Sequence, residues 1–230
     1  MARARGGRGG GGGCVARSAA SRSSSTAAGE AVAGALAHLE RLAAEREIEL
    51  VEDEGDATGV DLAIALGGDG TMLRALHRFL DTDVPVLGVN FGRVGFLASV
   101  PGAELVAGLE RALAGDFKVV ELGTLAVSLD GAPQIAINDV VATSSQPGRM
   151  IMLGWGVGHE DLGLQACDGM ICSTASGSTA YNLSNGGPVM MWGLDAMAIS
   201  FVAPHSLFAR PLVAPPGLGL DVTNRTADVP

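Results

Sequence analysis

Residues 66–71 read Leu-Gly-Gly-Asp-Gly-Thr and surround one carboxylate with three glycines, between an apolar run and a segment with helical spacing. Main chain without side chains can approach phosphate oxygens closely, and the amides that open a following helix point at such an anion. Asp69 would repel a phosphate, but it is well placed to take a proton from a hydroxyl that attacks phosphorus, or to help hold a metal ion. The loop therefore predicts phosphoryl transfer; the alternative is a simple strand-to-helix turn.

Two common phosphate-binding loops do not fit this sequence. A Walker loop needs a lysine after its last glycine, and the only lysine of the chain, Lys118, follows Phe117. A dinucleotide-binding loop needs a third glycine at a set spacing after Gly70, and none is present there.

A second loop, at residues 173–181, is rich in hydroxyl side chains and precedes a short polar segment. Hydroxyls and free amides at a helix entrance can bind phosphate or ribose oxygens, although such a loop can equally serve only to cap a helix. Tyr181, the only tyrosine of the chain, could stack on a nicotinamide or adenine ring, or could fill the core. The five hydroxyl residues are Ser173, Thr174, Ser176, Ser178 and Thr179.

Isolated polar residues elsewhere are candidates for recognising a substrate. Asn138 and Asp139 end an apolar run, where an amide can recognise a base or hydroxyl; side chains of these types also commonly form turns. Asp168, before Gly169, has the same two interpretations. Arg149 is a sparse positive charge in an acidic region and could face a phosphate or lie solvated on the surface.

Composition limits the class of protein. The chain has 230 residues, enough for one large or two small domains, and 47% are hydrophobic, but no apolar run approaches the roughly 18 residues of a membrane span. We therefore expect a soluble protein. The net charge is −10, and after the five arginines that precede Glu30 the chain has 10 basic and 25 acidic residues, which argues against nucleic-acid binding.

Cysteines and histidines indicate neither disulfides nor a zinc site. Cys14, Cys167 and Cys172 are too few and too scattered for a disulfide framework, which favours a reducing compartment such as the cytoplasm. The four histidines include no pair at metal-ligand spacing. The cysteines and histidines therefore predict no metal site.

The apolar pattern divides the chain into three segments. Residues 1–28 are rich in Gly, Ala, Ser and Arg and are predicted to be disordered, or to be a tag or a targeting segment. Residues 29–118 alternate helix and strand patterns, which predicts a three-layer α/β domain with a parallel sheet carrying the glycine loop. Residues 119–230 contain short β-like pieces, which predicts a β-rich domain that is incomplete at its C-terminus.

Taken together, these residues resemble the NAD kinase family. The similarity covers roughly residues 58 to 228, and the family's motifs occur in their usual order. They lie at residues 67–71, 88–97, 137–141, 168–181 and 204–212.

The resemblance implies an activity and its partners. Members of the family phosphorylate the 2′-hydroxyl of the adenosine ribose of NAD to give NADP, with ATP and sometimes polyphosphate as the donor. They require a divalent cation, usually Mg²⁺ with the nucleotide, and form homodimers or homotetramers through the β-rich domain. No membrane or nucleic-acid partner is implied.

The resemblance also implies roles for individual residues. Asp69 would be the general base, Gly70 would let the dinucleotide approach the main chain, and Arg74 would lie near the donor phosphates. Asn138 and Asp139 would hold a ribose or the adenine edge, and Arg149 and Asp168 would contact the substrate. A further run would line the dinucleotide: Thr179, Ala180, Tyr181, Asn182, Leu183 and Ser184.

The sequence departs from the family at several places. Ala175 stands where proline is common, and Asp139 where glutamate is frequent. The first strand of the family's α/β domain is expected to be missing ahead of Glu30, and its last β strands beyond Pro230. Two alternatives therefore stay open: a lipid or diacylglycerol-type kinase, which shares the Gly-Gly-Asp-Gly-Thr loop, and a catalytically inactive dinucleotide-binding fragment.

Overall fold

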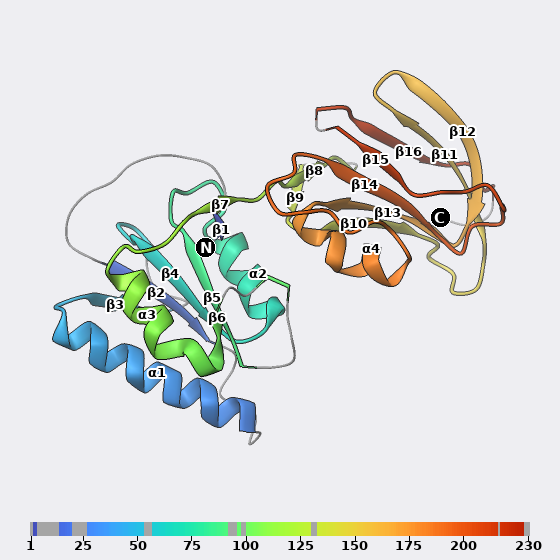
Figure 1. Ribbon diagram of the computed structural model, residues 1–230. Coiled ribbons are helices and arrows are strands. Elements are labelled where there is room, and N and C mark those ends of the chain that lie inside the picture. Colours follow the sequence, from blue (N-terminus) through green and yellow to red (C-terminus); the bar gives the residue numbers. More distant parts are fainter. Residues whose placement is uncertain are drawn as a thin grey trace. The chain divides into compact units, whose positions relative to one another are not determined.

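The computed structural model describes residues 2–3, 14–19, 27–52, 57–91, 96–97, 100–129, 133–215 and 217–227. The chain forms two compact units, Met1–Glu121 and Leu122–Pro230 (Figure 1). The division lies three residues after the boundary expected from the sequence.

The first unit is built on a mainly parallel sheet. Its strands are β1 (Ala2–Arg3), β2 (Cys14–Ala19), β3 (Glu49–Val51), β4 (Leu62–Leu66), β5 (Val86–Asn90), β6 (Val100–Pro101) and β7 (Val120–Glu121). They pair in the order β3-β2-β4-β5-β1-β7, with β6 also on β5, and every pair is parallel except β1 with β5. The helices are α1 (Ala27–Glu45), α2 (Asp69–Arg78), the 3-10 turn η1 (Gly102–Glu104) and α3 (Leu105–Leu113).

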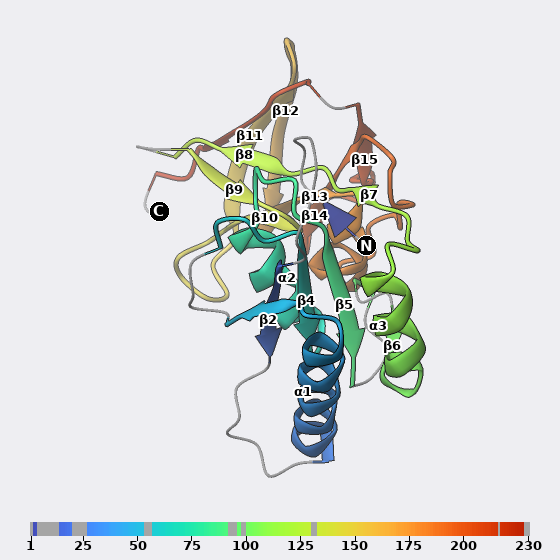
Figure 2. The same cartoon turned by 90° about the vertical axis from the view of Figure 1, so that its left-hand side faces the viewer.

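The core of this unit explains why β4 reads as a continuous apolar run. All five residues of β4 are buried, because a parallel strand is covered on both faces. Leu62, Ile64 and Leu66 share one core cluster with Leu39 of α1 and Leu109 of α3. The four buried residues of α2 lie outside that cluster, and Figures 1 and 2 show α2 across the strands from α1 and α3. The three-layer α/β prediction is confirmed.

The structure corrects the prediction for part of the N-terminal segment. The composition of residues 1–28 predicts no regular structure there, but Cys14–Ala19 forms β2, which pairs in parallel with both β3 and β4. Two ladders of main-chain hydrogen bonds hold this strand, and Val15 is buried in the core. The strand expected to be missing ahead of α1 is therefore present; residues 4–13 and 20–26 lie outside the described residues.

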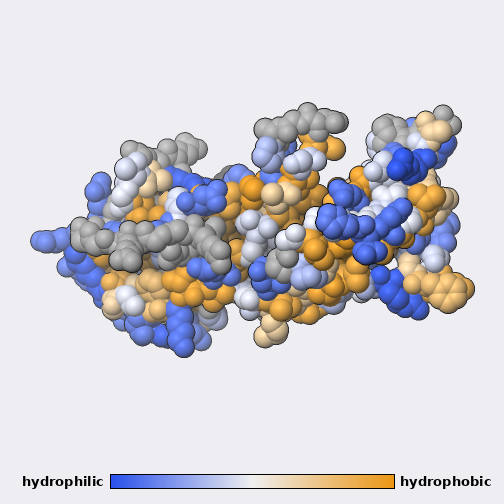
Figure 3. Space-filling view, turned by 90° about the horizontal axis from the view of Figure 1, so that it is seen from above, coloured by the Kyte–Doolittle hydropathy of each residue, from blue (hydrophilic) through white to orange (hydrophobic). Residues whose placement is uncertain are grey.

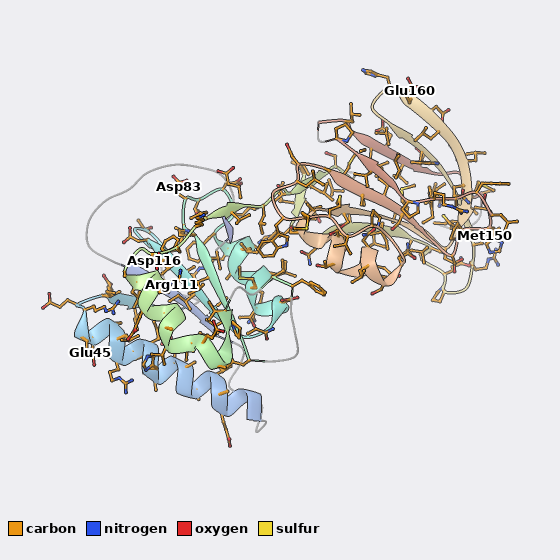
Figure 4. The ribbon with its side chains drawn as sticks, viewed as in Figure 1. Glu45, Asp83, Arg111, Asp116, Met150 and Glu160 are labelled. Atoms are coloured by element: carbon orange, nitrogen blue, oxygen red, sulfur yellow. The ribbon has the colours of Figure 1, made fainter. Side chains whose placement is uncertain are left out.

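An ion pair lies at the end of α3. Arg111 Nε donates to Asp116 Oδ2 at 2.8 Å, and the labelled side chains are drawn together in Figure 4. Both side chains are about two-thirds exposed, so solvent screening leaves the pair a contribution of at most about 1 kcal/mol.

The second unit is β-rich, as predicted. Its strands are β8 (Leu125–Val127), β9 (Gln134–Ala136), β10 (Asp139–Thr143), β11 (Ile151–Val157), β12 (Glu160–Cys167), β13 (Gly169–Thr174), β14 (Met197–Val202), β15 (Leu212–Ala214) and β16 (Leu220–Asn224), with the 3-10 turn η2 (Ser176–Thr179) and the short helix α4 (Tyr181–Ser184). They form antiparallel sheets in the orders β10-β13-β14-β15, β12-β11-β16 and β8-β9.

The core of the second unit lies between its two larger sheets. Ile151 and Leu153 of β11 share a cluster with Met170 of β13 and Ile199 of β14. The rings of Trp155 and Phe201 meet edge to face, with centroids 5.1 Å apart and planes at 81°. Two sheets that share one apolar interior form a sandwich, so this unit has a core of its own.

Several large apolar side chains remain on the surface. The most exposed are Leu129, Met191, Leu207 and Phe208, and Figure 3 shows apolar side chains over much of the face turned to the viewer. Among the described residues, no helix has the length and apolar character needed to cross a membrane.

Candidate functional site

The junction of β4 and α2 exposes main chain at the start of a helix. Gly68 caps α2, and its carbonyl accepts hydrogen bonds from the amides of Thr71 and Met72. A Cβ on Gly67 would lie 2.5 Å from Thr71 Oγ1, so the close turn requires glycine. A Cβ on Gly68 or Gly70 would meet nothing within 4 Å. The first amides of a helix have no partner within it, so this open main chain is suited to binding an anion.

Asp69 is the first residue of α2, and its half-buried carboxylate is held by main-chain amides. The Phe96 N–H donates to Oδ2 at 3.1 Å, and the Leu97 N–H donates to Oδ1 at 3.3 Å. Leu97 is buried, which anchors this segment. A carboxylate can accept about four hydrogen bonds, so each oxygen retains a lone pair for a further donor.

Arg74 lies on the exposed side of α2. It follows Gly70 by four residues, and residues at that spacing share one helix face. Asp69, Gly70 and Arg74 therefore all lie on the ten-residue helix α2, and the roles that the resemblance implies for them stay a prediction.

In the second unit, one cluster joins Asn138, Asp139 and Tyr181. Asp139 pairs with Ser173 across β10 and β13, and its carboxylate accepts a hydrogen bond from the main-chain N–H of Tyr181. Burial raises the pKa of the Asp139 carboxyl above its ordinary value, and the Tyr181 N–H opposes that shift only in part. Asn138 Oδ1 is buried and has no hydrogen-bond partner among the described residues. A buried acceptor without a donor is costly, and a ligand donor would satisfy it.

Most hydroxyl groups of the loop at residues 173–181 form hydrogen bonds inside the protein. Ser173, Thr174, Ser176 and Ser178 are at most 3% exposed, and their hydroxyls bond to main-chain groups or to each other. Of the two interpretations of this loop, binding of phosphate or ribose oxygens by the hydroxyls is wrong for these four residues, because their side chains are buried. Thr179 is half-buried and donates to Ser176 O at 3.4 Å.

The helix α4 presents some predicted residues and buries another. Tyr181 is 46% exposed and Leu183 39% exposed, and Ser184 is also on the surface, so the alternative that Tyr181 fills the core is wrong. Asn182 is fully buried: its Nδ2 donates to Ser178 O and Pro188 O, and its Oδ1 accepts from Ser200 Oγ. The side chain of Asn182 therefore supports the loop from within.

Comparison with known proteins assigns the chain to a family. The ATP-NAD kinase N-terminal domain matches residues 15–117, and the ATP-NAD kinase C-terminal domain matches residues 137–229. The NAD kinase of Gemmatimonas aurantiaca is 38% identical over 199 residues, covering 82% of this chain and 68% of that protein. The chain belongs to the NAD kinase family.

Other proteins of the NAD kinase family are also similar to this chain. The NAD kinase of Heliobacterium modesticaldum is 44% identical over 161 residues, covering 68% of this chain but only 57% of that protein, so the chain spans just over half of that relative's length. The NAD kinase from Archaeoglobus fulgidus, solved in complex with ATP, superposes with a TM-score of 0.75 at 26% identity, covering 92% of this chain and 80% of that one. Yeast NADH kinase complexed with NADH shares the fold, with a TM-score of 0.74 at 21% identity over 95% of this chain and 74% of that one.

Within this NAD kinase family member, two predicted residues lie apart from the Asn138 cluster. Asp168 immediately precedes β13, whereas Ser173, the partner of Asp139, is near its other end, about 17 Å away at the rise of an extended strand. The exposed Arg149 closes a turn through its N–H to Gln146 O. The structure therefore does not bring Asp168 and Arg149 together with Asn138.

A hollow of about 330 Å³ lies elsewhere, on the β12-β11-β16 sheet. Its lining includes Gly154, Gly156 and Glu160, and Figure 4 labels Glu160 beside the β11–β12 hairpin. It contains none of the predicted site residues. The candidate site residues are therefore those of the Asp69 cluster in the first unit and, separately, those of the Asn138 cluster in the second unit, and not the lining of this hollow.

The amides that hold Asp69 were missed by the sequence analysis. Phe96 and Leu97 were recognised only as part of a motif, not as partners of the carboxylate. A usable signal existed: Asp69 follows β4, residues 96–97 follow β5, and these strands are parallel neighbours. The carboxyl ends of adjacent parallel strands lie at one sheet edge, where loops from both can meet.

Proposed function

We propose that the chain is an ATP-dependent NAD kinase, which transfers a phosphoryl group to the 2′-hydroxyl of the adenosine ribose of NAD and so forms NADP. The observation that carries the proposal is the Asp69 carboxylate, held by the amides of Phe96 and Leu97 beside the open main chain of Gly68 and Gly70. Membership of the NAD kinase family gives independent support.

Asp69 acts as the general base. Its carboxylate accepts the proton of the ribose 2′-hydroxyl while that oxygen bonds to the terminal phosphorus of ATP. The bond from this phosphorus to the bridging oxygen breaks, and ADP leaves with the electron pair. The two amide donors fix the direction of the carboxylate, so little orientational freedom is lost when the hydroxyl arrives.

The donor phosphates are assigned to the start of α2. Amides at a helix N-terminus bind anions, and Arg74 adds a positive charge on the same helix face as Gly70. Polyphosphate presents the same oxygens and is a second possible donor.

The reaction requires a divalent cation, with Mg²⁺ as the expected ion. Among the described residues no group of three or more His, Cys, Asp or Glu side chains could hold a metal. Mg²⁺ is commonly held by one or two carboxylates together with substrate phosphates, and Asp69 is the candidate carboxylate. When bound, the ion would neutralise charge on the phosphoryl group.

The dinucleotide is assigned to the Asn138 cluster. Asn138 Oδ1 needs a hydrogen-bond donor, such as an adenine amine or a ribose hydroxyl. The Asp139 carboxylate can accept a hydrogen bond from a hydroxyl, and the exposed Tyr181 ring can stack on a base. Thr179, Ala180, Leu183 and Ser184 complete the lining, with Asn182 behind them. Arg149 and Asp168 are proposed to contact another part of the substrate.

Assembly and location follow the family. We propose a homodimer or homotetramer formed through the β-rich unit, working in the cytoplasm. Cys167 and Cys172 are free thiols in the structure, as suits a reducing compartment.

The test is an acceptor and donor panel with the purified chain. Mg²⁺ and ATP, or polyphosphate, are incubated with NAD, NADH or diacylglycerol, and NADP is measured with an NADP-specific dehydrogenase. Formation of NADP from NAD supports the proposal. Phosphorylated lipid alone would instead identify a lipid kinase, and saturable NAD binding without turnover would identify an inactive binding fragment.

A further inference from the structure

The hydroxyl of Thr174 joins two segments that are far apart in the sequence. Thr174 is 3% exposed, and its Oγ1 lies 2.7 Å from Ile137 O and 3.1 Å from Asn138 O. The Gly177 N–H donates to the same oxygen at 2.9 Å. Because a hydroxyl has one proton and two lone pairs, it donates to the chain before β10 while accepting from the turn η2.

Other contacts tighten the same junction. The Thr174 N–H donates to Asn138 O at 2.8 Å, and Asp139 accepts from the Tyr181 N–H. A Cβ on Gly177 would overlap the main chain of Asn138, so η2 lies directly against that residue. The two ends of segment 174–181 therefore hold this pair: Thr174 bonds to Asn138, and Tyr181 bonds to Asp139. Among the described residues, Asn138 Oδ1 has no hydrogen-bond partner.

We propose that Thr174 is a positioning residue, whose hydroxyl fixes Asn138 and Asp139 in the orientation that binds NAD. This inference rests on the proposed function. Without the hydroxyl, the Gly177 N–H loses its acceptor and is buried unpaired, and the Ile137 carbonyl keeps only a long hydrogen bond of 3.5 Å from Ser176 Oγ, so the strand end shifts to regain hydrogen bonds. Among the described residues, the hydrogen bonds of Thr174 all lie within the second unit, so we expect loss of its hydroxyl to weaken the binding of the acceptor NAD and to leave the binding of the donor ATP unchanged.

The test compares Thr174→Val, which keeps the shape but loses the hydroxyl, with Thr174→Ser, which keeps the hydroxyl. Measurements are kcat, KM for NAD and for ATP, and the Kd of NAD by calorimetry. We expect Thr174→Val to raise both the KM and the Kd for NAD about tenfold, with KM for ATP changed less than about twofold. Thr174→Ser should stay within about twofold of the unaltered chain for NAD.

Ser178→Ala is the matched control. Ser178 is equally buried in the same loop, but its hydroxyl bonds to Ala175 O and the Met190 N–H, not to Asn138. It should lower Tm without changing KM for NAD. If Thr174→Val does not fold, Ser176→Ala removes a hydroxyl that lies 3.1 Å from Thr174 Oγ1, and KM for NAD should rise about threefold.

Three results would overturn the inference alone, given an active unaltered chain. These are an unchanged NAD KM in Thr174→Val (or in Ser176→Ala, should the valine variant unfold), equal losses in Thr174→Val and Thr174→Ser, and an equal rise in KM for ATP. An unaltered chain that neither binds nor phosphorylates NAD would overturn the proposed function, and the inference with it.

Discussion

At the scale of single residues, Asp69 carries the chemistry, and replacing it by asparagine removes the base while keeping the size of the side chain. Asp69→Asn should lower turnover at least about a hundredfold, the usual contribution of a positioned base, while most NAD affinity remains. Turnover, calorimetric Kd and Tm are measured together. Asp81→Asn is the matched control, because Asp81 is exposed and its φ of 58° suits asparagine. Near-normal turnover in Asp69→Asn would disprove the base assignment.

A second prediction at this scale concerns pH. Burial raises the pKa of Asp139 above 3.8, so the folded chain binds its proton more readily than the unfolded chain. The stability contribution of Asp139 therefore falls as pH rises through the interval just above 3.8. Asp139→Asn keeps an acceptor for the Tyr181 N–H but cannot titrate. As pH rises across that interval, the Tm of this variant should therefore increase relative to the Tm of the unaltered chain. A Tm difference that is independent of pH would contradict this account.

At the scale of elements, two glycines should respond oppositely to alanine. Gly177 lies against the Asn138 main chain, so Gly177→Ala should displace η2 and destabilise the chain by more than about 2 kcal/mol. Gly34 lies exposed within α1 with open space around its would-be Cβ, so Gly34→Ala should stabilise by up to about 1 kcal/mol. Urea unfolding measures both. A Gly177→Ala chain as stable as the unaltered one would show that η2 is not tightly packed.

The elements that position Asp69 could be predicted because their signals are local. The apolar run of β4 and the helical spacing of α2 both lie within a few residues of the glycine loop. β2 was missed because Cys14–Ala19 has weak apolar character, and its stability comes from pairing with β3 and β4, which are distant in sequence. Secondary structure that depends on such pairing leaves little trace in a local pattern.

In the candidate site, too, some features could be predicted from the sequence and others could not. Asp69 could be named from the glycine loop around it, and Asn138 and Asp139 from their place after an apolar run, whereas the roles of Gly70 and Arg74 came only from the resemblance to the family. The directions of the side chains could not be predicted from the sequence. The sequence therefore did not predict which polar side chains of the loop are buried: Ser173, Thr174, Ser176, Ser178 and Asn182. Polar side chains satisfied inside a loop resemble ligand-binding ones in sequence, because both use the same donors and acceptors.

At the scale of the whole molecule, each unit has its own core, and two thiols report on the second one. Cys167 and Cys172 are buried there, and burial raises the pKa of Cys172 to about 11. Since the thiolate is the reactive form, both should resist iodoacetamide at neutral pH in the folded chain and react in urea. Peptide mass spectrometry locates the label. Rapid labelling of Cys172 without denaturant would show that this core opens readily.

The central claim concerns the whole chain acting on NAD, and ³¹P NMR of the reaction products tests it most directly. With Mg²⁺, ATP and NAD, we predict that a phosphomonoester resonance of an adenosine 2′-phosphate grows in step with ADP, and that both are lost in Asp69→Asn. ADP formed without that resonance, or the same resonance at the same rate in Asp69→Asn, would contradict the account.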